Sequence, residues 1–172
     1  MMVATLALWL TTSLAAAQDS PNPDDVFADR ILEAPVSRVF EELQAPSRIA
    51  QLFPGDCATD WSFSGPEEGL GARLSTTYHA GAMHRDLEGM LTRSEAEWIV
   101  ELHYEGLRGF TTHFLIEPAV TGEDETTKVR IISYLGPPPW PFKGHFYKKV
   151  KPAWQDCYER VLQQLDVRLQ QE

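Results

Sequence analysis

Hydrophobic and polar residues follow two different periods along the chain, and the changes of period divide it into elements. A first strand is predicted from Val26 to Glu33, where the two kinds of residue alternate. Pro35 then suits the first turn of a helix. In that helix apolar residues recur at helical spacing at Val36, Val39, Phe40 and Leu43. Pro46 ends it, and a second short helix is predicted from Ser47 to Phe53.

From Cys57 to Leu135 the period changes to two, which is typical of strands with one buried face. Six such segments follow one another, with inward positions at Trp61 and Phe63; Leu74, Thr76 and Tyr78; Leu87, Gly89 and Leu91; Trp98, Val100, Leu102 and Tyr104; Phe110, Thr112, Phe114 and Ile116; and Val129, Ile131, Ser133 and Leu135. Short loops between alternating strands predict an antiparallel meander with one face turned inward.

A stiff, proline-rich hinge from Gly136 to Pro141 separates these strands from a last helix. Between Lys143 and Gln170 the helix is predicted from an apolar stripe at Phe142, Phe146, Val150, Trp154, Cys157, Val161, Leu162, Leu165 and Leu169. Roughly 28 residues would span about 42 Å. Pro152 lies inside this range, so the helix should kink or restart there. The order of elements predicts an α+β sheet curled around an amphipathic helix.

The span from Val26 to Gln170 resembles the START-like superfamily, also called SRPBCC, which includes polyketide cyclase and dehydrase-like and lipid-transport domains. The resemblance rests on Arg30–Leu43, Trp61, Gly69–Arg73, Leu87–Leu91 and the long terminal helix. It implies the helix-grip fold, a seven-stranded antiparallel sheet wrapped around the C-terminal helix, with two short helices between the first two strands and an apolar cavity. Because one fold hosts many functions, the resemblance implies an architecture and not an activity.

The inward strand positions carry large side chains with a few hydroxyl groups among them. A pocket for a small molecule is usually apolar, with a few polar groups that orient the guest. We therefore expect ligand contacts from Tyr78, Trp98, Leu102, Tyr104, Phe110, Thr112, Phe114, Ser133 and Trp154. The alternative is a filled core, in which the hydroxyls bond to the backbone or to each other.

These patterns favour an exported binding module for a small hydrophobic or lipid-like molecule. A second hypothesis is a cofactor-independent cyclase, dehydratase or isomerase acting on a hydrophobic, polyketide-like substrate. Its candidate groups are the pocket hydroxyls with Tyr78, Tyr104 or the pair His84 and Asp86. A third is a protein-interaction role without a small ligand. Only Arg85 among the ionisable residues is a candidate for an inward position, so binding is favoured over catalysis and no catalytic residue is assigned.

Composition narrows the class of partner. A chain of 172 residues fits one domain, which we expect to be a monomer. The net charge of -10 argues against a nucleic-acid partner, because such proteins need a basic face for the phosphates. The five histidines show no metal-ligand spacing, so neither a metal nor a cofactor is expected.

The first residues differ from the rest of the chain. Met1 to Ala17 contain no charged side chain, and an apolar run from Val3 to Leu10 is followed by Ala15–Ala17, a small-residue cleavage pattern. This predicts a signal peptide over residues 1–17, a polar linker over 18–25 and the START-like domain over 26–172. The mature protein would begin at Gln18 in the periplasm or outside the cell. The alternative is an uncleaved anchor.

The two cysteines, Cys57 and Cys157, could form a disulfide in an exported protein. They lie at a predicted strand start and in the middle of the last helix, and sequence does not establish the α-carbon distance of about 7 Å or less that pairing requires. Cys157 also fits the apolar stripe, where a free cysteine behaves as a small hydrophobe. The pattern therefore favours two separate thiols, with the disulfide as the alternative.

The segment from Trp140 to Lys151 is basic within an acidic chain. Aromatic residues there interleave with four lysines, Lys143, Lys148, Lys149 and Lys151. Such a segment can make a weak contact with an anionic membrane surface or hold an anionic head group at a pocket mouth. The alternative, which the sequence favours, is an amphipathic helix start whose lysine stems cover apolar surface.

Overall fold

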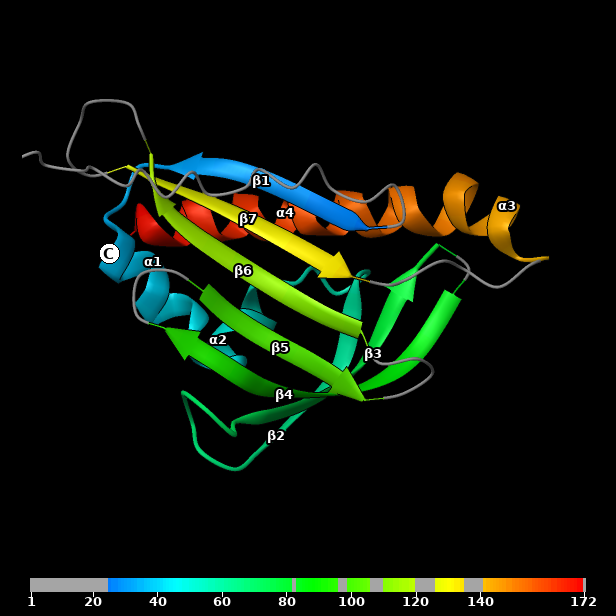
Figure 1. Cartoon of the computed structure of the whole chain (residues 1–172), viewed down its shortest axis with the longest axis horizontal. Coiled ribbons are helices and arrows are strands. Elements are labelled where there is room, and N and C mark those ends of the chain that lie inside the picture. The colour runs from blue at the N-terminus through cyan, green and yellow to red at the C-terminus, as the bar shows by residue number, and fades with distance from the viewer. Residues whose placement is uncertain are drawn as a thin grey trace, which may run out of the picture.

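A seven-stranded antiparallel sheet curls around a long C-terminal helix, and two short helices lie between its first two strands (Figure 1). The computed structural model describes residues 25–81, 83–95, 99–105, 110–119, 126–134 and 141–171. The strands are β1 (Val26–Leu32), β2 (Ala58–Ser64), β3 (Arg73–Ala80), β4 (Met83–Glu95), β5 (Ile99–Glu105), β6 (Phe110–Pro118) and β7 (Thr127–Tyr134). The helical segments are α1 (Val36–Leu43), α2 (Pro46–Leu52), α3 (Lys143–His145), the π-helical η1 (Phe146–Val150) and α4 (Lys151–Leu169). The predicted α+β architecture and its element order are confirmed.

Some sequence-based predictions lie outside the described residues. These are the signal peptide over residues 1–17, the linker except for Asp25, the side chain of Trp98, and the hinge from Gly136 to Trp140. For Phe110 the structure describes the strand backbone only. Among the helices that are described, none is both long and apolar enough to cross a membrane.

The sheet is a meander whose last strand pairs with the first, in the order β1-β7-β6-β5-β4-β3-β2. Val26 of β1 lies opposite Ser133 of β7, and Thr112 of β6 also lies opposite Ser133 from the other side. Gly81 makes the turn between β3 and β4 with φ 62, a left-handed conformation that glycine adopts without steric cost. The register places the inward positions Val26, Ser133 and Thr112 in one row across three strands.

The edge strand β2 departs from the predicted alternation. Its pairing with β3 shifts between Thr59 and Ser62, and Asp60 there has a positive φ of 56. Trp61 still packs against the core, whereas Phe63 is 47% exposed. The prediction that Phe63 faces a covered interior is wrong, because it lies near the end of an edge strand with a paired neighbour on one side only.

Two prolines mark the starts of the short helices. Pro35 is extended and directly precedes α1, and Pro46 occupies the first turn of α2, where its missing N–H leaves no helical hydrogen bond unmade. An ion pair also links the first helix to the last. The buried Glu42 carboxylate of α1 forms this ion pair with the Arg168 guanidinium of α4, with Oε2 and Nε 2.8 Å apart.

The C-terminal helix changes type next to Pro152 but runs on without interruption, so the predicted kink or restart is not seen. The π-helical segment η1 ends at Val150, and α4 begins at Lys151 with Pro152 in its first turn. The Lys151 N–H donates to the Phe146 carbonyl oxygen, which joins η1 to α4. The buried face of α4 is formed by Trp154, Cys157, Tyr158, Val161, Leu162 and Leu165. From Trp154 to Leu165 it follows the predicted stripe, with Tyr158 as an addition. The prediction that the stripe begins at Phe142 is wrong, because that residue precedes the helix and is 65% exposed.

Cys57 and Cys157 form a disulfide, with an S–S distance of 2.11 Å and α-carbons 5.9 Å apart. The prediction of two separate thiols is therefore wrong. Cys157 is buried on the apolar face as expected, but the curl of the sheet brings the turn before β2 to the same place. Arg160 joins the same two elements, since its guanidinium donates to the Asp56 carboxylate at 2.9 Å and to Cys57 Sγ at 3.1 Å.

Candidate functional site

Three tyrosines and a tryptophan meet between the inner face of the sheet and α4. Tyr78 comes from β3, Tyr104 from β5, and Trp154 and Tyr158 from α4. Strand alternation turns the first two inward, and a spacing of four residues places the other two on one face of the helix. All four are at most 7% exposed. We call these four residues the aromatic cluster.

The rings of this cluster continue into a row that reaches the edge of the sheet. The ring centroids of Tyr78 and Trp154 are 4.9 Å apart, and those of Trp154 and Tyr158 are 6.4 Å apart. On the other side Phe53 meets Tyr78 at 6.1 Å and Trp61 at 5.5 Å. Tilted and edge-on contacts at these distances are favourable for aromatic pairs. The interior therefore offers a continuous set of ring surfaces.

Three hydroxyl groups, those of Thr112, Ser133 and Tyr158, lie together where the row of rings reaches Tyr158 of α4. Thr112 Oγ1 and Ser133 Oγ are 2.6 Å apart across neighbouring strands. The Tyr158 hydroxyl is hydrogen-bonded to Ser133 and lies 3.4 Å from Thr112 Oγ1. Buried hydroxyls are costly unless they are paired, and here they pair with each other. This group fastens α4 to β6 and β7.

The Tyr78 hydroxyl differs from that group. Tyr78 is 4% exposed, and within the described part of the chain its hydroxyl makes no hydrogen bond of normal geometry, although the Trp154 indole N–H lies close enough to lower its pKa. A buried hydroxyl left without a partner costs about 1–3 kcal/mol. Tyr78 thus presents a polar atom inside an apolar surrounding.

Burial also determines the protonation of these phenols. Desolvation raises the pKa of Tyr78 well above its usual value, the neighbouring Tyr158 and Tyr104 hydroxyls raise it further, and the Trp154 indole opposes this rise by a smaller amount. Desolvation likewise raises the pKa values of Tyr104 and Tyr158. The phenols remain protonated at neutral pH, so they can donate hydrogen bonds but cannot act as bases.

Gly89 makes room for one ring of the cluster. It lies opposite Tyr104 in the pairing of β4 with β5. A β-carbon at this position would be 2.8 Å from Tyr104 Cε1 and 3.0 Å from Tyr104 Cδ1. Glycine in a strand often marks such a close approach. The Tyr104 ring can therefore approach the backbone of β4 closely.

The structure brings most of the expected ligand-contact residues to this region. Tyr78, Tyr104 and Trp154 lie in the aromatic cluster, and Thr112 and Ser133 lie in the hydroxyl group. Two further expected contacts, Leu102 and Phe114, are each 1% exposed within the same core. The last two, Trp98 and the side chain of Phe110, lie outside the described residues.

Sequence reasoning missed Tyr158. It lies four residues after Trp154 and three before Val161, so the helical period could have found it. The predicted stripe included Cys157 and left out Tyr158, although these adjacent residues are both buried on α4.

The candidate acid–base pair of the enzyme hypothesis does not form. Asp86 accepts a hydrogen bond from the Thr77 hydroxyl at 2.8 Å. His84 instead contacts the His79 ring, whose other nitrogen lies 3.0 Å from Thr59 Oγ1. These side chains lie on the outer face, so they do not reach the aromatic cluster.

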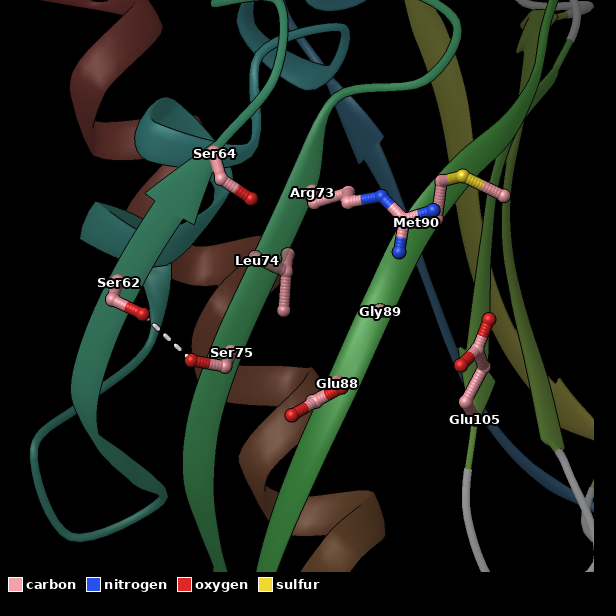
Figure 2. A pocket seen from close by; sticks show the side chains of 9 residues that line it. All are labelled: Ser62, Ser64, Arg73, Leu74, Ser75, Glu88, Gly89, Met90 and Glu105. Carbon is pink, nitrogen blue, oxygen red and sulfur yellow. Dashed lines mark hydrogen bonds between the residues drawn. The ribbon is translucent and has the colours of Figure 1, made fainter.

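The opposite face of the sheet carries a pocket of about 210 Å³. Figure 2 shows it from outside, with helices visible behind the strands. It is lined by Ser62, Ser64, Arg73, Leu74, Ser75, Glu88, Gly89, Met90 and Glu105. Its charged side chains, Arg73, Glu88 and Glu105, are exposed to solvent. This outer pocket therefore lacks the buried polar groups with which a small-molecule site typically orients its ligand.

Comparison with known proteins identifies the architecture. No protein-family model and no curated protein matches the chain. The solution structure of KanY protein matches with a TM-score of 0.66 at 11% identity, covering 85% of this chain and 97% of that one. Protein TTHA0849 of Thermus thermophilus matches with a TM-score of 0.69 at 17% identity, covering 86% and 97%. The chain has the helix-grip fold.

A plant protein shares this architecture at still lower identity. The major latex-like protein 151 of Panax ginseng matches with a TM-score of 0.58 at 9% identity, covering 84% of this chain and 95% of that one. KanY and the ginseng protein have helix-grip folds of the Bet v 1 type, in agreement with the element order seen here. At such identities the likeness shows the fold alone, because one fold hosts many functions.

Proposed function

We propose that this protein is an exported START-like binding module that holds a small, largely apolar molecule between its sheet and α4. One observation supports this function above the others: the Tyr78 hydroxyl is buried among aromatic rings, and in the described part of the chain it makes no hydrogen bond of normal geometry. Phenylalanine would keep the ring contacts with Phe53 and Trp154 and avoid the cost of the unpaired hydroxyl. A guest with a hydrogen-bond acceptor would give this hydroxyl a partner.

The surroundings of Tyr78 indicate the class of guest. Every side chain of the aromatic cluster is uncharged, which favours a neutral molecule over an ion. The rings offer flat apolar surfaces, and the raised pKa of Tyr78 keeps its phenol as a donor. We therefore infer a ring-containing or otherwise apolar molecule with an oxygen acceptor, such as a carbonyl group.

Binding is favoured over acid–base catalysis. General-base chemistry needs a group that can take up a proton near neutral pH. The buried phenols have raised pKa values, and the pair of His84 and Asp86 does not form. The enzyme alternative would have to use the phenols as proton donors alone.

The disulfide supports export. Bonds of this kind persist in oxidising compartments such as the periplasm or the extracellular space. The pair Cys57–Cys157 is therefore in keeping with a cleaved N-terminal segment and a mature chain starting at Gln18. Amino-terminal sequencing of secreted protein tests this, and intact Met1 in a cytoplasmic fraction would contradict it.

Tyr78→Phe tests the binding function. The probe is Prodan, a neutral naphthyl ketone whose emission reports both polarity and hydrogen bonding. We expect its affinity to fall about tenfold, corresponding to about 1.4 kcal/mol. We also expect the free energy of unfolding to stay the same or rise by about 1 kcal/mol, because the unpaired hydroxyl is gone.

Tyr134→Phe is the matched control. Tyr134 is 43% exposed, and its ring contact with His113 would remain. It should change neither affinity nor stability appreciably. If Tyr78→Phe lowers stability and leaves Prodan affinity unchanged, the hydroxyl serves the fold and not a guest.

A further inference from the structure

A basic surface lies at the start of the C-terminal helix. We call it the basic end and define it by seven residues of 142–151, namely Phe142, Lys143, Phe146, Tyr147, Lys148, Lys149 and Lys151. The chain has 25 acidic residues, yet none lies between Glu125 and Asp156. The local charge is therefore opposite in sign to the net charge of -10.

The side chains of the basic end expose both positive charge and apolar surface to solvent. Phe142 is 65% exposed, and Lys148 and Lys149 are exposed on η1. The Lys143 ammonium lies 5.9 Å from the centre of the Tyr147 ring. Val150 is buried and holds the segment against the fold. Lysines and aromatic rings thus share one solvent-facing patch.

A second part of the chain reaches the same end of the molecule. A β-carbon at Gly81, in the turn between β3 and β4, would be 3.6 Å from the Lys149 carbonyl oxygen and 4.0 Å from Ala153 Cβ. The exposed residues His84 and Arg85 follow this turn on β4. Figure 1 shows the β3–β4 turn and α3 at one end of the structure. Two segments that are distant in sequence, each with basic residues, therefore lie at the same end of the structure.

We propose that the basic end docks on an anionic lipid surface. Lysines near such a surface are attracted by the phosphate and carboxylate head groups, and an exposed aromatic side chain can enter the interface beside them. The excess of acidic residues elsewhere is repelled, which orients the molecule with this end toward the lipid. The exposed Phe142 distinguishes the surface from one that would bind an acidic protein through charge alone.

Docking in this orientation would place the start of α4 next to the lipid. Trp154 of the aromatic cluster lies one helical turn beyond Val150. A guest drawn from the bilayer would thus have a short way to the proposed site. Vesicle binding itself does not depend on that site, so either proposal can fail without the other.

The test is sedimentation of the full chain with vesicles, without added ligand. One set is phosphatidylcholine alone, and the other also contains about one quarter phosphatidylserine. We expect at least tenfold stronger binding to the anionic set and loss of this difference at high salt, because screening removes the attraction. The N-terminal residues Met1–Ala17 carry no charged side chain, so they should contribute equally to both sets.

Lys148→Gln/Lys149→Gln should lower binding to the anionic vesicles about tenfold or more, since each lysine near the surface contributes about fivefold. Arg93→Gln/Lys128→Gln is the control, because it changes the net charge equally but removes basic groups from β4 and β7. It should lower binding by less than about twofold. Equal losses in the two variants, or equal binding of the wild type to both vesicle sets, would overturn the proposal.

Discussion

Gly89→Ala probes the packing on which the candidate site depends. The added β-carbon would lie 2.8 Å from Tyr104 Cε1, 3.0 Å from Cδ1 and 3.4 Å from Leu74 Cδ1. Carbon atoms pack best at about 3.5–4.0 Å, so the ring or the strand must move by roughly 0.5–1 Å. The substitution therefore displaces Tyr104 within the aromatic cluster.

The expected cost combines two opposing effects. Overpacking of a well-packed core costs about 1–3 kcal/mol. Replacing a glycine inside a strand recovers about 0.5–1 kcal/mol, because the unfolded chain loses freedom. We expect a net loss of about 0.5–2 kcal/mol in the free energy of unfolding. For a domain of this size this lowers the melting temperature by about 1–8 °C.

Thermal and urea unfolding measure this loss of stability in four variants, which are Gly89→Ala, Gly144→Ala, Tyr104→Leu and the double variant Gly89→Ala/Tyr104→Leu. Gly144→Ala is the control, because a β-carbon there meets nothing within 4 Å. It should leave stability unchanged or raise it slightly. In a Tyr104→Leu background the ring atoms are gone, so Gly89→Ala should no longer destabilise. The resulting coupling energy should be about 1–2 kcal/mol. If Gly89→Ala behaves like Gly144→Ala, the ring does not lie over Gly89.

Two further substitutions follow from the same interior. Tyr158→Phe should cost about 1–2 kcal/mol in urea unfolding, because the buried Ser133 hydroxyl loses one of its two partners and keeps only Thr112. A loss below about 0.3 kcal/mol would contradict the hydroxyl group described here. Cys57→Ser/Cys157→Ser opens a link between residues 100 apart in sequence, and chain-entropy arguments give a loss approaching about 4.7 kcal/mol. Unfolding with and without reductant measures it, and reductant should affect the wild type alone.

Local patterns in the sequence were enough to predict most of the fold. Period-two alternation turned Tyr78, Tyr104 and Thr112 inward, and helical spacing identified the buried face that carries Trp154. Pro152 lies where the last helix changes from π-helical to α-helical geometry. Such features depend on neighbours in the sequence, so they can be found without knowing which distant segments meet.

The features that could not be predicted depend on contacts between distant segments. The disulfide joins Cys57 to Cys157 only because the sheet curls far enough to bring the turn before β2 to α4. The exposure of Phe63 follows from the position of β2 at an edge of the sheet. Whether a buried hydroxyl such as that of Tyr78 finds a partner likewise depends on side chains far away in sequence.

The central claim is that a guest lies between the sheet and α4. Intermolecular nuclear Overhauser effects between Prodan and isotopically labelled protein test it most directly. We predict contacts from the naphthyl ring to the ring protons of Tyr78, Tyr104 and Trp154. Contacts confined to the outer pocket near Arg73 and Met90, or the absence of any saturable complex, would contradict the claim.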